Sequence, residues 1–145
     1  MIEILVVEDS ELFRRSVLSI IQERPDLRVI CEVADGLQAV QRAAELQPDV
    51  VLLDIGLPTL NGIEVARQIR SSAPHSHIVF LTQESSSEFV DKAVDLGAKG
   101  YIVKLDSRRD LLIGIDAVCR GETFVSSSLG GNGSKNGFLG RNRSE

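Results

Sequence analysis

The chain has few of the sulfur and imidazole side chains that build zinc or redox centres. Its 145 residues contain two cysteines and two histidines. Cys31 and Cys119 lie far apart, with no CxxC or Cys/His spacing, so we expect free thiols packed as small apolar side chains. His75 and His77 stand in the polar segment SSAPHSH, where we expect solvated loop histidines. The sequence therefore argues against a zinc site and against a disulfide framework.

Long hydrophobic runs and a basic leader are also missing. No apolar run approaches the roughly 20 residues that cross a bilayer. The start, MIEILVVEDSE, meets acids at once, so we expect no signal peptide and a cytoplasmic protein. The formal net charge of −5 disfavours non-specific binding to nucleic acid, because phosphates would be repelled. We expect no contact with a membrane.

Short apolar runs alternate with helical patterns along most of the chain. The predicted strands are 2–7, 28–34, 50–54, 78–82 and 100–104, and the predicted helices are 10–24, 35–46, 63–71, 86–96 and 107–120. Consecutive parallel strands need a helical crossover, so this order predicts a parallel α/β sheet with helices on both faces. In such sheets a ligand binds beyond the carboxyl ends of the strands.

The composition changes near residue 126. The segment SSSLGGNGSKNGFLGRNRSE is rich in Gly, Ser and Asn, and it has too few apolar residues to fold alone. We therefore expect a folded domain over 1–123 and a flexible tail over 124–145.

Polar side chains stand at the carboxyl ends of the predicted strands. Glu8 and Asp9 follow the first strand, and Asp54, Thr82 and Lys104 end the third, fourth and fifth. Carboxylates that lie close together repel each other, and a hard divalent cation such as Mg²⁺ relieves that repulsion through oxygen ligands. The ammonium adds positive charge and the hydroxyl adds a hydrogen-bond donor. This set suits a phosphoryl group on Asp54, since aspartate is an established nucleophile toward phosphate.

The chain resembles the receiver domain of two-component response regulators. The resemblance covers about residues 1–123 and rests on the segments ILVVEDSELFR, DVVLLDIGLPTLNGIEVARQIR, IVFLTQES and LGAKGYIVK. It implies a flavodoxin-like (βα)5 three-layer sandwich with strand order 2-1-3-4-5. It also implies a signalling phosphoacceptor with no enzymatic activity beyond its own phosphotransfer and slow autodephosphorylation. The implied partner is a sensor histidine kinase or a phosphotransfer protein.

The resemblance also implies a metal site. Asp54 is the implied phosphoacceptor, and it would bind Mg²⁺ or Mn²⁺ together with Glu8, Asp9 and the backbone carbonyl of Gly56.

A switch is implied beside that site. Thr82 and Tyr101 match the switch pair of the family, and Lys104 matches the lysine that contacts the phosphate. The output surface would consist of the fourth helix, the fifth strand and the fifth helix, and a homodimer through that surface is an open expectation.

The segment KLDSRRDLLIGIDAVCRGETFVS looks like the group of receivers that continues into a LuxR/NarL-type helix-turn-helix domain. The remaining residues are too few for that module, so we expect no direct DNA binding by this chain. It is either a stand-alone receiver or the receiver fragment of a LuxR/NarL-type transcriptional regulator. The chain departs from many receivers at Leu105, where a Pro in a cis bond is common, and at Gln83, where a smaller residue is commoner.

Three other functions compete with this interpretation. A phosphatase of the haloacid dehalogenase type would want D-x-D, but Gly56 stands two residues after Asp54. A flavin or nucleotide binder would want a Gly/Ser/Thr-rich phosphate loop after the first strand, and the chain has the acidic stretch EDSE there. A receiver that works unphosphorylated as a binding module is disfavoured by the complete acid, Thr and Lys set.

Overall fold

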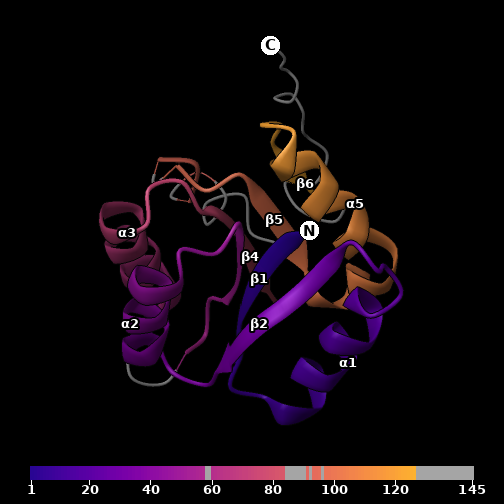
Figure 1. Ribbon diagram of the computed structural model, residues 1–145, viewed down its shortest axis with the longest axis horizontal. Coiled ribbons are helices and arrows are strands. Elements are labelled where there is room, and N and C mark those ends of the chain that lie inside the picture. The colour runs from indigo at the N-terminus through magenta and orange to yellow at the C-terminus, as the bar shows by residue number, and fades with distance from the viewer. Residues whose placement is uncertain (58–59, 84–90, 92, 96, 127–145) are drawn as a thin grey trace.

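The computed structural model describes residues 1–57, 60–83, 91, 93–95 and 97–126. Its strands form one parallel sheet in the order β2-β1-β3-β4-β5-β6 (Figure 1). The strands are β1 Ile2–Val7, β2 Leu27–Val33, β3 Val50–Asp54, β4 His77–Thr82, β5 Gly100–Val103 and β6 Phe124–Val125. The predicted order 2-1-3-4-5 is confirmed, with one further strand beside β5.

The helices lie in two layers on the faces of the sheet. They are α1 Glu11–Ile21, α2 Gly36–Leu46, α3 Gly62–Ser72 and α5 Ser107–Cys119, and a 3-10 turn η1 covers Lys104–Asp106. Figure 1 shows α2 and α3 on one side of the sheet and α1 and α5 on the other. This is the expected flavodoxin-like sandwich. Of the expected helix 86–96, the structure describes residues 91 and 93–95, which are helical.

Three helices begin with a side-chain cap directly after a strand or its loop. Ser10 accepts a hydrogen bond from Phe13 N at 3.2 Å, and Asp35 accepts one from Gln38 N at 2.9 Å. Asn61 likewise caps α3. These side chains satisfy amide groups that the first helical turn leaves unpaired. The local sequence therefore places three helix starts at the edge of the sheet where the strands end.

The sheet separates two apolar cores, and β3 lies between them. Val51 and Leu53 belong to the core under α2 and α3, whereas Val50 and Leu52 belong to the core under α1 and α5. Successive side chains of a strand point to opposite faces, so a strand covered on both faces must be apolar throughout. This explains why the apolar run of β3 is continuous up to Asp54.

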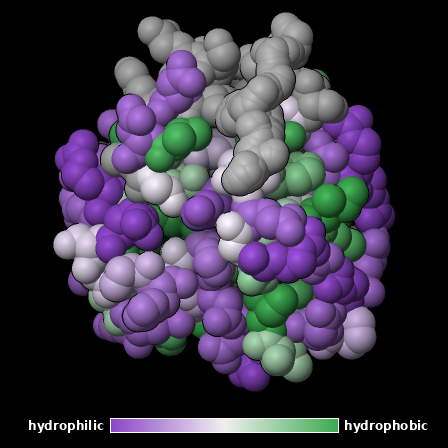
Figure 2. All heavy atoms as spheres, turned by 90° about the horizontal axis from the view of Figure 1, so that it is seen from above, coloured by the Kyte–Doolittle hydropathy of each residue, from purple (hydrophilic) through white to green (hydrophobic). Residues whose placement is uncertain are grey.

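The surface carries no large apolar area on the face seen from above. In Figure 2 hydrophilic residues dominate that face and hydrophobic ones form separate small areas. Among the residues that the structure describes, every helix is too short or too polar to cross a lipid bilayer.

Residues 124–126, which we expected in a flexible tail, belong to the sheet. Phe124 N donates to Lys99 O at 2.8 Å and Ser126 N donates to Tyr101 O at 2.9 Å, so 124–126 complete the ladder on the outer edge of β5. The pairing requires contact with a distant strand, which composition does not reveal. The rest of the expected tail, 127–145, lies outside the described residues.

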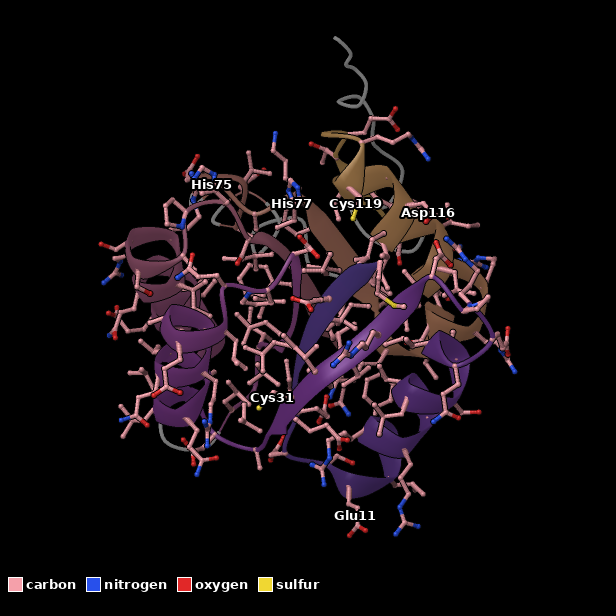
Figure 3. The ribbon with its side chains drawn as sticks, viewed as in Figure 1. Glu11, Cys31, His75, His77, Asp116 and Cys119 are labelled. Carbon is pink, nitrogen blue, oxygen red and sulfur yellow. The ribbon has the colours of Figure 1, made fainter. Side chains whose placement is uncertain are left out.

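Two smaller expectations also need correction. Lys104 begins η1 instead of ending β5, and His77 begins β4 instead of lying in a loop. Cys31 and Cys119 are free, half-buried thiols, as expected, on β2 and α5 (Figure 3).

Candidate phosphoacceptor and metal site

Three carboxylates meet at the carboxyl edge of the sheet. Glu8 follows β1 and is wholly buried, Asp54 ends β3 with 4% exposure, and Asp9 is exposed. One oxygen from each lies within 4.8 Å of the others. The two strands pair in register up to Val7 and Leu53, which sets both acids at the same height. The structure therefore brings the three predicted metal-binding side chains together.

The loop after β1 is fixed by bonds to Glu8. Its Oε2 accepts a hydrogen bond from Ser10 N at 2.9 Å. Its backbone carbonyl accepts one from Arg14 Nη1 at 2.7 Å, and Arg14 Nε lies 3.3 Å from Glu32 Oε1. These contacts hold the loop between α1 and β2, so Glu8 and Asp9 are presented from a fixed backbone.

The loop after β3 approaches its own strand closely. Gly56 N donates to Asp54 Oδ1 at 3.0 Å, which orients the carboxylate from the following turn. Gly62 starts α3 against the end of β3, and a Cβ there would lie 2.6 Å from Ile55 Cα. Since real Cβ atoms do not approach that closely, glycine is needed at this position. Asp54 is thus positioned by the strand before it and by the loop after it.

Lys104 joins the cluster from the start of η1, directly after β5. Its Nζ lies 2.9 Å from Glu8 Oε1 and 3.4 Å from Asp54 Oδ1. It also lies 4.7 Å from the centroid of the Phe13 ring, a distance at which a cation is attracted by the ring face. The ammonium is therefore held between two carboxylates and an aromatic ring.

The described part of this cluster has more negative than positive charge. Three carboxylates face one ammonium. Burial raises the pKa of Glu8 above its ordinary value, and the charge of Asp54 adds to the rise, whereas Ser10 N–H and Lys104 oppose it. Oxygen donors with excess negative charge are what Mg²⁺ prefers. The residues fit a hard divalent cation.

The predicted switch residues lie on the two next strands. Thr82 ends β4 with a buried side chain, and it pairs in register with Val103 of β5. Tyr101 is wholly buried, and its ring centroid lies 6.4 Å from that of Phe80. The Tyr101 hydroxyl donates to Ala98 O, at the amino end of β5. Tyr101 thus points into the core, away from the carboxylate cluster.

The burial of Tyr101 changes the pKa of its hydroxyl. Burial raises the pKa of Tyr101 well above its ordinary value, and Asp95 adds to the rise. The phenol is therefore a neutral hydrogen-bond donor at physiological pH.

The turn after Lys104 departs from the pattern of many receivers. Leu105 stands in η1 with 94% of its surface exposed. Gln83, which follows Thr82, is also exposed. Both side chains are therefore largely in contact with solvent.

Sequence reasoning missed two side chains at the site. Neither Phe13 nor Arg14 is among the site residues that the strand ends predict. Phe13 stands four residues after Asp9, one helical turn from the cap, which places it over the site edge. That spacing was the available signal. The histidines do not contribute, because Figure 3 shows His75 and His77 at the edge opposite to Glu11.

The chain matches a family model over most of its length. The response regulator receiver domain matches residues 4–116. The chain belongs to the response regulator receiver family. The curated relatives of this receiver include the transcriptional regulatory protein LnrK of Bacillus subtilis, 36% identical over 113 residues, which are 78% of this chain and 51% of that protein. LiaR of the same organism is 31% identical over 131 residues, 90% of this chain and 62% of LiaR. The receiver therefore spans half to three-fifths of these relatives.

Solved structures agree with the fold. A LuxR-family two-component response regulator from Aurantimonas sp. SI85-9A1 superposes with a TM-score of 0.83 and 32% identity, covering 87% of this chain and 90% of that one. The response regulator domain of Thermotoga maritima CheB gives a TM-score of 0.77 and 31% identity, over 83% and 97% of the two chains. The receiver is thus related to LuxR-family response regulators.

Proposed function

We propose that this receiver is a cytoplasmic signalling switch that accepts a phosphoryl group on Asp54 from a sensor histidine kinase or a phosphotransfer protein. One observation carries the proposal. Lys104 Nζ lies 3.4 Å from Asp54 Oδ1, beside the carboxylates of Glu8 and Asp9, at the edge where parallel sheets bind ligands. A buried acid beside an ammonium and a metal-binding cluster suits phosphoryl transfer.

The transfer requires one bond to form and one to break. Asp54 Oδ forms the new oxygen–phosphorus bond, while the phosphorus–nitrogen bond of a phosphohistidine breaks and the imidazole keeps the electron pair. With acetyl phosphate as donor, a phosphorus–oxygen bond breaks and acetate leaves. Glu8, Asp9, Asp54 and the Gly56 carbonyl would hold Mg²⁺ or Mn²⁺, which neutralises phosphoryl oxygens when bound. The receiver transfers phosphate only to itself and loses it slowly by hydrolysis.

The remaining residues convert the modification into a change of surface. Lys104 would exchange its contact with Glu8 for a phosphoryl oxygen, and the Thr82 hydroxyl would donate to another. Such new bonds bias a two-state element. Tyr101, on the next strand, would report the change to the surface formed by the fourth helix, β5 and α5. A homodimer or a partner protein would bind there, and β6 would take part because it covers the edge of β5.

Phosphorylation with acetyl phosphate tests the function. The wild-type chain should gain one phosphoryl group by mass spectrometry in Mg²⁺ and none in excess chelator. Asp54→Asn should gain none, and the exposed Asp91→Asn should react like the wild type. Equal modification of Asp54→Asn, or modification that survives chelation, would refute the assignment.

A second function is favoured by the length of the relatives. LnrK and LiaR are named transcriptional regulatory proteins, and this receiver spans 51% and 62% of them. The alternative is that the chain is the receiver of a LuxR/NarL-type transcriptional regulator, with DNA binding supplied by a further domain. The coding sequence downstream of Glu145 tests it: an immediate stop codon contradicts this alternative.

A further inference from the structure

The short strand β6 and Ser126 after it attach residues 124–126 to β5, the strand that precedes Lys104. Gly100 pairs with Phe124 and Tyr101 with Val125, so β5 lies between β4 and β6 (Figure 1). Ser126 N then donates to Tyr101 O at 2.9 Å. An edge strand would leave these backbone groups to water. In this receiver they bond instead to residues that follow α5.

Ser126 is the most strongly held residue of that attachment. Its side chain is buried, with 1% of the residue exposed. Oγ accepts a hydrogen bond from Val103 N at 3.1 Å and donates one to Asp110 Oδ2 at 2.9 Å. Asp110 is itself buried and accepts from Arg109 Nε at 2.9 Å. The hydroxyl therefore uses both its donor and its acceptor capacity, which an alanine cannot replace.

The bonds of Ser126 to β5 lie next to Lys104, a residue of the phosphoacceptor site. Ser126 bonds to the backbone of Tyr101 and of Val103, and Val103 is followed directly by Lys104. Lys104 Nζ lies 3.4 Å from Asp54 Oδ1. The backbone that carries Lys104 is thus fixed by Ser126, a residue far along the chain from it.

We propose that Ser126 is a positioning residue of the phosphoacceptor site and that its bonds to β5 are coupled to the phosphorylation state of Asp54. The inference rests on the proposed function. Fixing the end of β5 reduces the freedom that Lys104 loses when it contacts a phosphoryl oxygen. Coupling between two sites is reciprocal, so a phosphoryl group that orders Lys104 also strengthens the bonds of Ser126.

Beryllofluoride binding to the full chain tests the coupling, because this anion imitates a phosphoryl group on aspartate. With Mg²⁺ present, Ser126→Ala should bind beryllofluoride roughly fivefold more weakly than the wild type, the factor expected for one net hydrogen bond. Ser126→Thr keeps the hydroxyl and should recover most of the affinity.

Ser76→Ala is the matched control. Ser76 is also a buried serine, 5% exposed, whose hydroxyl donates to a backbone carbonyl, that of Pro48. It lies before β4 at the opposite edge of the sheet. Urea unfolding should show a loss of stability in both Ser76→Ala and Ser126→Ala. The beryllofluoride affinity of Ser76→Ala, in contrast, should equal that of the wild type.

Amide hydrogen exchange supplies a second readout. Beryllofluoride with Mg²⁺ should slow exchange of the Ser126 and Val103 amides in the wild type and leave His77 N, bonded to Asp49 O, unchanged. Equal beryllofluoride affinity of Ser126→Ala and wild type, or equal weakening in Ser76→Ala, overturns the positioning role. Absence of binding by the wild-type chain overturns the proposed function itself, and the inference with it.

Discussion

The two edges of the same sheet satisfy their polar groups in different ways. At the carboxyl edge, the charged side chains of Glu8, Asp54 and Lys104 contact one another. At the amino edge, polar side chains bond to backbone: Asp49 Oδ2 accepts from Glu3 N at 2.8 Å, and the Ser76 hydroxyl donates to a carbonyl. Both edges belong to the same strands, so the difference lies in the side chains that each edge carries.

The difference shows where a sheet can do chemistry. A side chain bonded to backbone is satisfied by the fold and needs no ligand. Charged side chains that contact one another leave an excess of negative charge at the carboxyl edge. Burial raises the pKa of Glu8 there, and the charge of Asp54 adds to the rise. A cation or a phosphoryl group would change that excess of charge at the carboxyl edge.

Replacing a lysine at each edge should give the largest difference, in phosphorylation rate and in Mg²⁺ affinity. Lys104→Met removes the ammonium beside Asp54, so phosphorylation by acetyl phosphate should slow roughly 100-fold, as expected for loss of a charge-assisted contact. Mg²⁺ should bind more tightly to this variant, because Lys104 competes for Glu8 and Asp54. Lys99→Met, an exposed lysine before β5, should change neither quantity. Rates by mass spectrometry and Mg²⁺ titration by calorimetry measure both effects.

Replacing a glutamate near each end of β1 should give the next largest difference, in the stability gained from Mg²⁺. Mg²⁺ binds the folded state, so at ten times its dissociation constant it should add about 1.4 kcal/mol to the free energy of unfolding. Glu8→Gln should lose most of that gain, since it removes a charged ligand, and Glu3→Gln should keep it. Urea unfolding with and without Mg²⁺ decides between them; an equal gain in both variants would contradict the assignment of Glu8.

The aromatic ring under Lys104 should have a smaller effect. Phe13→Leu removes the cation–π contact, which is worth about 0.5–1 kcal/mol, so phosphorylation should slow a few-fold. Phe13→Tyr keeps a ring face and should stay near the wild-type rate. In a Lys104→Met background the Phe13→Leu change should have no further effect on the rate. An additive effect there would show that Phe13 acts only through packing.

The free energy of unfolding should depend on pH through His77, at the amino edge of the sheet. Desolvation, with the nearby charge of Lys99, lowers the pKa of His77 below its ordinary value, although Asp49 opposes this. The unfolded chain then binds the proton more readily, so stability is lost as pH falls through about 6.5 toward the lower folded pKa. The loss should be small, below about 0.5 kcal/mol, because His77 is only half-buried. His77→Gln should lose less stability than the wild type between pH 7.5 and 5.5, as urea unfolding at the two pH values would measure.

Periodicity predicted most of the fold because each strand and helix buries its own apolar face. The run Val50–Asp54 was predicted with the bounds that the structure shows. The β-α alternation predicted a parallel sheet, and the family resemblance supplied the strand order. The acids and Lys104 could be placed together from sequence, since parallel strands end at one edge. Contacts that depend on side-chain direction, such as Phe13 beneath Lys104, were not accessible in this way.

By itself, the sequence determined the alternation of strands and helices, the capped helix starts and the charged residues at the strand ends, because these depend on neighbours within one or two turns. The tertiary structure decided what joins them across the chain. It set Tyr101 in the core, brought Arg14 to the carbonyl of Glu8, and paired Phe124–Val125 with β5. The physical reason is that each of these contacts joins backbone or side-chain groups whose distance is fixed only when the sheet and its covering helices have packed.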